Sequence, residues 1–288
     1  IRLFAPDGIE IPVQTDKHGM SCFHVEEPLL WSAEKPHLYR LLMETEDEAI
    51  GETIGLRTVR VENGVMLIND VPVKLRGVNR HEFTPELGRV VTRESTKADL
   101  LMMKQAHINA VRTAHYPDNP FFYELCNELG FYVIDECDLE THGFEIEGDP
   151  DRLANDPTWE KAYLDRAERT YQRDKNQPCV IMWSLGNESF AGDVLAKMNA
   201  YFKAVDPDRL VHYEGVVNNR VYEDRISDVE SRMYATPQAI REYLENSPKK
   251  PFILCEYMHD MGNSLGGFGS YHKLVDEFPM MHGGYTVS

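Results

Sequence analysis

The sequence lacks any apolar stretch that could span a membrane, since none of its hydrophobic runs approaches the roughly 20 residues required. It also lacks low-complexity segments, and 42% hydrophobic and 27% charged residues are ordinary for a globular protein. Residues 1–6 include no Met and do not have the layout of a signal peptide. We therefore predict no membrane partner. A length of 288 residues suits one barrel-sized domain plus a smaller piece.

Cysteine and basic residues are also scarce. The chain has five Cys, an odd number without paired spacing, so we interpret them as reduced residues. They are Cys22, Cys126, Cys137, Cys179 and Cys255. Reduced cysteines predict a cytoplasmic location. The 30 Lys and Arg against 48 Asp and Glu give a net charge of −18, which disfavours nucleic acid and anionic membrane surfaces as partners.

Two apolar segments each lead to a glutamate. Residues 179–185 precede Glu188, and residues 251–255 precede Glu256. Apolar runs of this kind, flanked by Pro or Gly, are typical of strands buried on both faces. A carboxylate at the end of such a strand is costly to desolvate unless solvent, a partner or a substrate meets it. Two such carboxylates suit chemistry on a glycosidic bond, but a strand-terminal Glu can equally be a helix-capping or ion-paired group.

Residues 1–59 consist of short, alternating segments separated by turns. The alternation predicts antiparallel strands with one polar face at 9–13, 21–25 and 38–44. So few strands cannot close a sandwich. We interpret residues 1–59 as the C-terminal part of an immunoglobulin-like β-sandwich whose start is absent.

Residues 60–288 change to a rhythm of buried strand, loop and amphipathic helix. The expected strands are 73–78, 110–113, 131–135, 180–184, 210–213, 228–231, 252–255 and 284–287. The expected helices are 96–106, capped by Ser95, and 121–129, 159–175, 192–205 and 237–246. This alternation predicts an α/β fold, a (β/α)₈ TIM barrel. The sixth strand is weakly patterned and no closing helix is evident, so we expect the barrel to be truncated at its C-terminal end.

Polar residues gather just after the expected strands. The carboxyl ends of the strands carry the chemistry of a TIM barrel, so these residues should converge on one face. They are Asn79, Arg80, His81, Glu82, Arg112, His115, Glu136, Asp138, Glu140, His142, Asn187, Glu188, Glu214, Tyr234, Glu256 and His259. Any one His would more often be a structural residue. Their coincidence at strand ends indicates an active site.

Five segments carry a resemblance to a known enzyme family. They are LRGVNRHE at 75–82, VRTAHYP at 111–117, ETHG at 140–143, WSLGNES at 183–189 and LCEYMHDMGNSLGGF at 254–268. They resemble glycoside hydrolase family 2, and within it the large cytoplasmic β-galactosidases, over about residues 30–285. The resemblance implies a retaining exo-β-galactosidase that removes terminal β-D-galactose from lactose-like disaccharides.

The resemblance also implies a role for each matching residue. Glu188 matches the general acid/base and Glu256 the nucleophile of a double displacement, which requires carboxyl groups about 5–5.5 Å apart. Arg112 is suited to hold Glu256 ionised, and Asn187 matches the residue that binds the sugar 2-hydroxyl. The other matching substrate-binding positions are His81, His115, Tyr234 and His259.

A metal is implied in the same way. Glu140, His142 and Glu188 match magnesium ligands of the family. Mg²⁺ prefers oxygen ligands, so one His among them is tolerable but not diagnostic. From spacing alone, Glu140 and His142 could equally form an ion pair in a polar loop. The resemblance further implies a homo-oligomer for the full-length enzyme, with the family's sodium site incomplete in this chain.

The chain departs from the family's pattern near residue 288. The segment MHGGY at 281–285 fits, but TVS at 286–288 stands where the family has an aromatic floor for the galactose ring. The family's N-terminal jelly-roll domain and C-terminal domains have no counterpart here. Two alternatives therefore stay open: an inactive or incomplete catalytic-domain fragment, and a sister β-glucuronidase or β-mannosidase. A glucuronidase should show extra basic groups for its substrate, and no obvious cluster is present.

Overall fold

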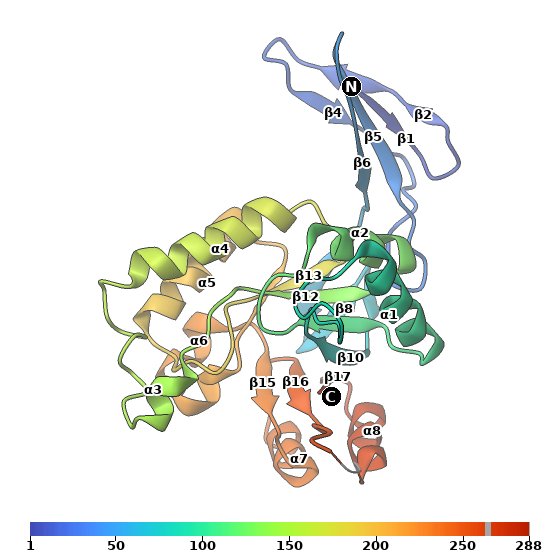
Figure 1. The fold of residues 1–288 in the computed structure, drawn as a ribbon. Helices are drawn as coiled ribbons and strands as arrows, with labels where there is room; N and C mark the ends of the chain where they lie inside the picture. Colours follow the sequence, from blue (N-terminus) through green and yellow to red (C-terminus); the bar gives the residue numbers. More distant parts are fainter. Residues whose placement is uncertain (263–265, 288) are drawn as a thin grey trace.

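Eight parallel strands form the centre of the molecule in the computed structural model, which describes residues 1–262 and 266–287 (Figure 1). They neighbour one another in the order β14-β13-β12-β11-β10-β17-β16-β15. Their bounds are Leu75–Arg80 (β10), Ala110–Thr113 (β11), Tyr132–Glu136 (β12), Val180–Ser184 (β13), Leu210–His212 (β14), Glu230–Met233 (β15), Phe252–Tyr257 (β16) and Met281–Thr286 (β17). The predicted TIM barrel is confirmed.

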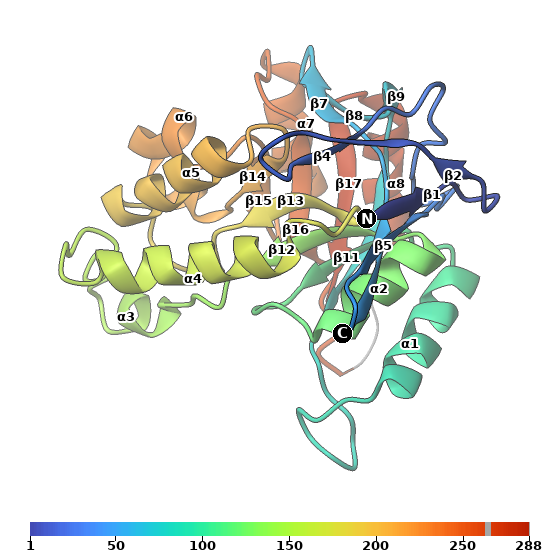
Figure 2. The ribbon, with the colours of Figure 1, turned by 90° about the horizontal axis from the view of Figure 1, so that it is seen from above.

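Helices connect successive strands on the outside of this barrel (Figure 2). They are α1 (Arg93–Gln105), α2 (Pro120–Leu129), α4 (Glu160–Asp174), α5 (Asp193–Val205), α6 (Glu223–Ile226), α7 (Pro237–Glu245) and α8 (Phe268–Glu277). A short helix, α3 (His142–Ile146), lies in the loop after β12. No helix among the described residues is long and apolar enough to cross a membrane.

Local chemistry sets the helix boundaries. Helix α2 has Asn119 as its N-cap, Pro120 in the first turn and Gly130 in the left-handed conformation at its end. The expectation that Ser95 caps α1 is wrong. Thr92 is the cap, because its hydroxyl accepts from the Ser95 backbone N–H and the Ser95 hydroxyl accepts from that of Thr92, each at 3.1 Å. This reciprocal capping box starts the helix three residues earlier than expected.

The strand order is open at one seam, between β14 and β15, where a single backbone hydrogen bond crosses, from the Asp228 N–H to the Val211 carbonyl at 2.8 Å. Side chains from the segment before β15 also satisfy the edge of β14. The Asp228 carboxylate accepts from the Val211 N–H at 2.7 Å, and the Ser227 hydroxyl accepts from the Tyr213 N–H at 3.1 Å. The sixth strand therefore begins at Glu230, two residues later than expected. Across the seam, His212 Nε2 lies 2.8 Å from Ser231 Oγ.

The eighth strand is more complete than expected. Strand β17 pairs in parallel with both β10 and β16, and it is preceded by α8, which the sequence did not reveal. Outside the barrel, a groove of about 600 Å³ lies over β10 and β17, and it is lined by residues of α8 and by the end of α1.

The N-terminal strands form a separate slab that projects from the barrel (Figure 1). A four-stranded antiparallel sheet has the order β2-β1-β5-β6, and β3 pairs with β4. Their bounds are Arg2–Phe4 (β1), Glu10–Ile11 (β2), Val13–Thr15 (β3), Ser21–Phe23 (β4), Tyr39–Glu44 (β5) and Ala49–Ile54 (β6). These strands are consistent with part of a β-sandwich. Trp31 anchors the segment, since it is fully buried and its indole N–H donates to the Asn127 carbonyl at 3.0 Å.

A small sheet that the sequence did not reveal leads into the barrel. It contains β7 (Val59–Glu62), β8 (Val65–Ile68) and β9 (Val71–Pro72). His282 of β17 joins this sheet to the start of β10, since its ring accepts from the Met66 N–H at 3.0 Å and lies 2.7 Å from the Val73 carbonyl. The sheet therefore contacts the amino ends of the barrel strands and leaves their carboxyl ends free.

Candidate active site

The predicted site residues lie at or just after the carboxyl ends of the barrel strands. Arg112 is in β11 and Glu256 in β16, while the others follow their strands within a few residues. Those others are His81, His115, Glu140, His142, Asn187, Glu188, Tyr234 and His259. Parallel strands bring these positions to one end of the barrel. Three residues of the LCEYMHDMGNSLGGF segment, 263–265, lie outside the described residues.

Arg112 is fully buried and connects four side chains. Its guanidinium donates to both oxygens of Glu136, at 2.7 and 3.0 Å, and to the Asn79 amide oxygen at 3.0 Å. It also donates to Glu256 Oε1 at 2.9 Å and to the Asn187 amide oxygen at 2.7 Å. A buried guanidinium with this many charge-assisted partners fixes their relative positions. Arg112 thus connects Glu256 with Asn187, the residue that precedes Glu188.

Glu256 accepts hydrogen bonds at both of its carboxyl oxygens. Its Oε1 accepts from Arg112, and its Oε2 accepts from the Tyr234 hydroxyl at 2.6 Å. Hydrogen bonds to both carboxyl oxygens fix the orientation of the group. Burial, together with this contact to Glu256, raises the pKa of Tyr234. Tyr234 therefore stays protonated and acts as a donor.

Glu188 is placed differently. Its side chain is about one-third exposed, and its Oε2 lies 2.8 Å from His142 Nδ1. Partial burial raises its pKa, His142 opposes the shift, and the charges of Glu256 and Glu140 add to it. The two predicted catalytic carboxyl groups are therefore close enough to influence each other, and only one has a buried cation as a direct partner.

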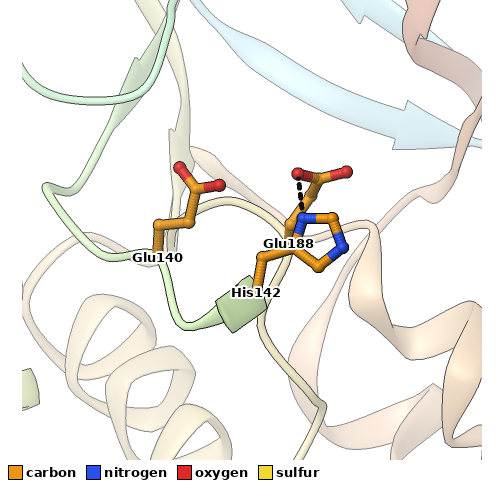
Figure 3. Close-up of side chains that lie close together, drawn as sticks. All are labelled: Glu140, His142 and Glu188. Carbon is orange, nitrogen blue, oxygen red and sulfur yellow. Dashed lines mark ion pairs between the residues drawn. The ribbon is translucent and has the colours of Figure 1, made fainter. Parts of the chain in front are cut away.

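The three residues predicted to hold a metal lie together. Each of Glu140, His142 and Glu188 offers one ligand atom, and these atoms all lie within 4.8 Å of one another (Figure 3). The trio is exposed or half-buried, so water could complete the coordination of an ion there. Two carboxylates and one imidazole fit a divalent cation such as Mg²⁺.

The predicted substrate-binding histidines surround the same opening. His115 Nδ1 lies 2.8 Å from Glu136, and its Nε2 lies 3.7 Å from Glu256 Oε1. The rings of His81 and His115 meet edge to face with centroids 5.4 Å apart. Burial lowers the pKa of His81, with the charge of His115 adding to the effect. His259 lies near Tyr234, and its Nδ1 is buried without a partner in the described residues. The ring nitrogens of these histidines can form hydrogen bonds with a polar ligand.

Sequence reasoning found Glu136 and Glu214 at strand ends but gave them no role. Glu136 is fully buried, and although burial raises its pKa, Arg112 and His115 lower it overall. It also accepts from the Ser184 hydroxyl at 2.7 Å, and this hydroxyl lies 2.9 Å from His212 Nδ1. The available signal was an apolar run, 131–135, that ends in a carboxylate, as the runs before Glu188 and Glu256 do.

Comparison with known proteins defines the family. Residues 59–288 match the TIM barrel domain of glycosyl hydrolases family 2, and residues 6–57 match a further part of that family. The chain belongs to glycosyl hydrolase family 2. Its membership covers most of the barrel and the β segment before it.

Relatives within glycosyl hydrolase family 2 are closely similar. The chain is 49% identical over 272 residues to a β-galactosidase of Halalkalibacterium halodurans, covering 91% of this chain and 27% of the relative. It is 51% identical over 267 residues to a β-galactosidase large subunit of Latilactobacillus sakei, covering 88% of this chain and 43% of that protein. The chain thus spans less than half the length of either relative.

Solved structures of the family share the fold. A β-glucuronidase of Ruminococcus gnavus superimposes with a TM-score of 0.81 at 23% identity, covering 99% of this chain and 55% of that chain. A β-glucuronidase of Bacteroides uniformis gives 0.79 at 19% identity, covering 99% and 41%. At these identities the likeness shows the fold alone.

Proposed function

We propose that this chain carries the catalytic centre of a retaining exo-β-galactosidase. The observation that supports it most is the unequal treatment of two carboxyl groups at one barrel end. Glu256 receives hydrogen bonds from Arg112 and Tyr234, whereas the pKa of Glu188 is raised. Two carboxyl groups in such different environments suit the separate tasks of general acid and nucleophile.

In the proposed first step, Glu256 attacks the anomeric carbon while Glu188 gives its proton to the glycosidic oxygen. A bond forms between the anomeric carbon and a Glu256 oxygen, and the bond to the leaving oxygen breaks. In the second step, Glu188 takes a proton from water, whose oxygen attacks the same carbon and displaces Glu256. Two inversions retain the configuration. We propose that Asn187, whose amide oxygen accepts from Arg112, binds the sugar 2-hydroxyl.

We propose Mg²⁺ as the cation for Glu140, His142 and Glu188. When bound, it would supply positive charge beside the Glu188 carboxyl. The proposal is supported by the ligand chemistry of the trio and by their closeness. The family's sodium site remains predicted to be incomplete in this chain.

The preference for galactose is supported by relatives. One relative named β-galactosidase is 49% identical to the chain, and one named β-galactosidase large subunit is 51% identical. The two β-glucuronidases described above are 23% and 19% identical to it. Lactose-like disaccharides are therefore the substrates we propose. A sister β-glucuronidase or β-mannosidase remains the alternative enzyme.

Efficient hydrolysis in this proposal requires further polypeptide, whereas the chain itself holds the two catalytic carboxyl groups and retains slow activity. The chain covers 27% and 43% of the two relatives, one of which is named as a large subunit. We infer that the complete enzyme is oligomeric and that segments outside residues 1–288 complete the sugar pocket. An incomplete catalytic fragment is thus the second reading of the chain. A cytoplasmic location is proposed from its five free cysteines.

Hydrolysis of nitrophenyl β-galactoside tests the proposed function. Glu256→Gln should abolish the activity of the purified chain, because an amide cannot act as the nucleophile. Glu94→Gln, at an exposed position in α1, is the control and should keep it. Equal rates for the chain and Glu256→Gln would refute the proposed activity of this chain. Faster hydrolysis of the corresponding glucuronide would favour the sister enzyme.

A further inference from the structure

Tyr213 and Glu214, the two residues that follow β14, form hydrogen bonds with the main chain of Glu188 and Ser189. Glu214 Oε1 accepts from the Glu188 backbone N–H at 2.7 Å. The Tyr213 hydroxyl accepts from the Ser189 N–H at 3.0 Å and donates to the Ser189 carbonyl. Both side chains are buried. These three hydrogen bonds reach two successive residues, so they fix both the direction and the position of the backbone at Glu188 and Ser189.

The backbone at Glu188 has a conformation that neighbouring residues must stabilise. Glu188 has a φ of 37°, in the left-handed region that a residue with a Cβ seldom adopts. Such a conformation is strained and persists only where the surroundings determine it. On its other side, the Asn187 N–H donates to the Leu139 carbonyl at 2.9 Å. Released from Tyr213 and Glu214, Glu188 could relax to an ordinary backbone conformation and its side chain would turn.

Glu214 is a poor device for stability alone. Its Oε2 is buried without a hydrogen-bond partner in the described part of the chain, and a carboxyl group in that state costs free energy. Burial raises its pKa to about 7. Either protonation state leaves Oε1 able to accept from an amide. What the arrangement provides is one strong acceptor aimed at the N–H of a single residue.

Through Ser189, these hydrogen bonds also connect to the loop that carries Glu140 and His142. The Ser189 hydroxyl accepts from the Thr141 N–H at 2.9 Å. Thr141 lies between Glu140 and His142, so the position of Ser189 also affects the loop that carries them. The end of β14 is therefore linked to all three residues of the trio through hydrogen bonds of Glu188 and Ser189.

We infer that Tyr213 and Glu214 form a positioning pair that orients Glu188 as the proton donor and acceptor of the reaction. Neither residue contacts the reacting atoms in this account. The inference rests on the proposed function for its chemical consequence, but its structural part can be measured without any substrate.

The first measurement is hydrogen exchange of the Glu188 amide, followed by NMR on the chain. Glu214→Leu removes the acceptor, whereas Glu214→Gln keeps a carbonyl oxygen in its place. We expect exchange about 10-fold faster or more in Glu214→Leu, from a hydrogen bond worth about 1–3 kcal/mol. Glu214→Gln should exchange like the unaltered chain. Unchanged exchange in Glu214→Leu would overturn the inference, whether or not the chain is active.

The second measurement is the dependence of hydrolysis on the leaving group. A dinitrophenyl galactoside needs little help from an acid in its first step, whereas an alkyl galactoside needs much. Misplacing Glu188 should therefore slow the alkyl substrate about 10-fold more than the dinitrophenyl substrate, since general acid catalysis contributes about 10²–10⁴-fold. Azide, which replaces the base-assisted water in the second step, should accelerate turnover of the dinitrophenyl substrate by Glu214→Leu.

A destabilised control separates positioning from folding. Leu244→Ala empties a buried site in α7, within a different core cluster, and should slow both substrates equally without azide rescue. If Glu214→Leu behaves like Leu244→Ala, its role is structural and the inference fails. If no galactoside is hydrolysed by the unaltered chain, the proposed function fails for this chain, and the exchange measurement alone decides the positioning.

Discussion

At the residue scale, Arg112 is the centre of the site because its guanidinium donates hydrogen bonds to four different side chains. It joins Glu136, Asn79, Asn187 and Glu256 with distances from 2.7 to 3.0 Å. Sequence alone suggested the contact with Glu256, from a cation in one strand and a carboxylate in another. The Glu136 contact was not suggested, because a strand order does not specify which way each side chain points.

Replacing Arg112 by Met should destabilise the fold as well as the site. The change leaves Glu136 fully buried without its cation, and breaking a buried pair in this way costs about 3–5 kcal/mol. Urea unfolding measures the loss. Arg60→Met is the matched control, because its partners Glu62 and Asp70 are exposed and its loss should change the stability little. Similar losses in the two variants would show that Arg112 is not the centre of a buried network.

His212 should make the fold sensitive to acid. Burial lowers its pKa to about 3, below the ordinary value of 6.5, so the folded chain takes up this proton less readily than the unfolded chain. The stabilisation is complete above pH 6.5 and is lost progressively as pH falls towards 3. His212→Gln should flatten the pH dependence of the unfolding free energy by up to about 1.4 kcal/mol per pH unit. His18→Gln, at an exposed turn, should not. Equal slopes for both variants would contradict this assignment.

The metal trio gives a third expectation at this scale. Mg²⁺ that binds only the folded chain should stabilise it, by about 2.7 kcal/mol at 100 times its Kd. Glu140→Gln should remove most of that gain, and excess chelator should reverse it in the unaltered chain. Glu145→Gln, exposed in the neighbouring helix α3, should respond to Mg²⁺ as the unaltered chain does. A melting temperature that is the same with and without Mg²⁺ would show that the trio does not bind this ion.

At the element scale, strands with continuous apolar runs were predictable and their neighbours were less so. The expected bounds of β11 and β13 match the observed strands, because both are short, buried and flanked by polar residues or Pro. Helix α8 was missed because it follows Gly266 and Gly267, which read as a loop. Gly267 is in fact its N-cap, with a φ of 83°. The sixth strand begins later than expected because Ser227 and Asp228 meet β14 mainly through their side chains, with one backbone hydrogen bond, and not as a paired strand.

Strand β17 depends on glycine where it meets β10. Gly283 has a φ of 100°, and a Cβ there would lie 2.1 Å from the Leu75 carbonyl oxygen. Gly283→Ala should therefore cost about 3 kcal/mol or more in unfolding free energy, from overlap and backbone strain together. Gly269→Ala in α8, where nothing lies within 4 Å, should be neutral or slightly stabilising. An intact melting temperature for Gly283→Ala would refute this view of the β10–β17 contact.

At the scale of the whole molecule, the rhythm of strands and helices was enough to predict the barrel. It was also enough to predict that residues far apart in sequence, such as Arg112 and Glu256, would meet at one end. The seam, the small sheet at the other end and the contacts of Tyr213 and Glu214 were not predictable. The seam and the contacts of Tyr213 and Glu214 depend on hydrogen bonds between side chains and backbone that are remote in sequence, for which a single sequence carries no signal. The small sheet is local, but its strands are only two to four residues long.

Covalent trapping tests the central claim, that Glu256 is the nucleophile facing Glu188. A 2-deoxy-2-fluoro-β-galactoside with a dinitrophenyl leaving group should form the sugar ester quickly and lose it slowly, because fluorine destabilises both transition states and the leaving group assists only the first. Mass spectrometry of peptides should find one fluorogalactosyl group per chain, on Glu256, and none in Glu256→Gln. An ester on another residue, or no ester at all, would contradict the account.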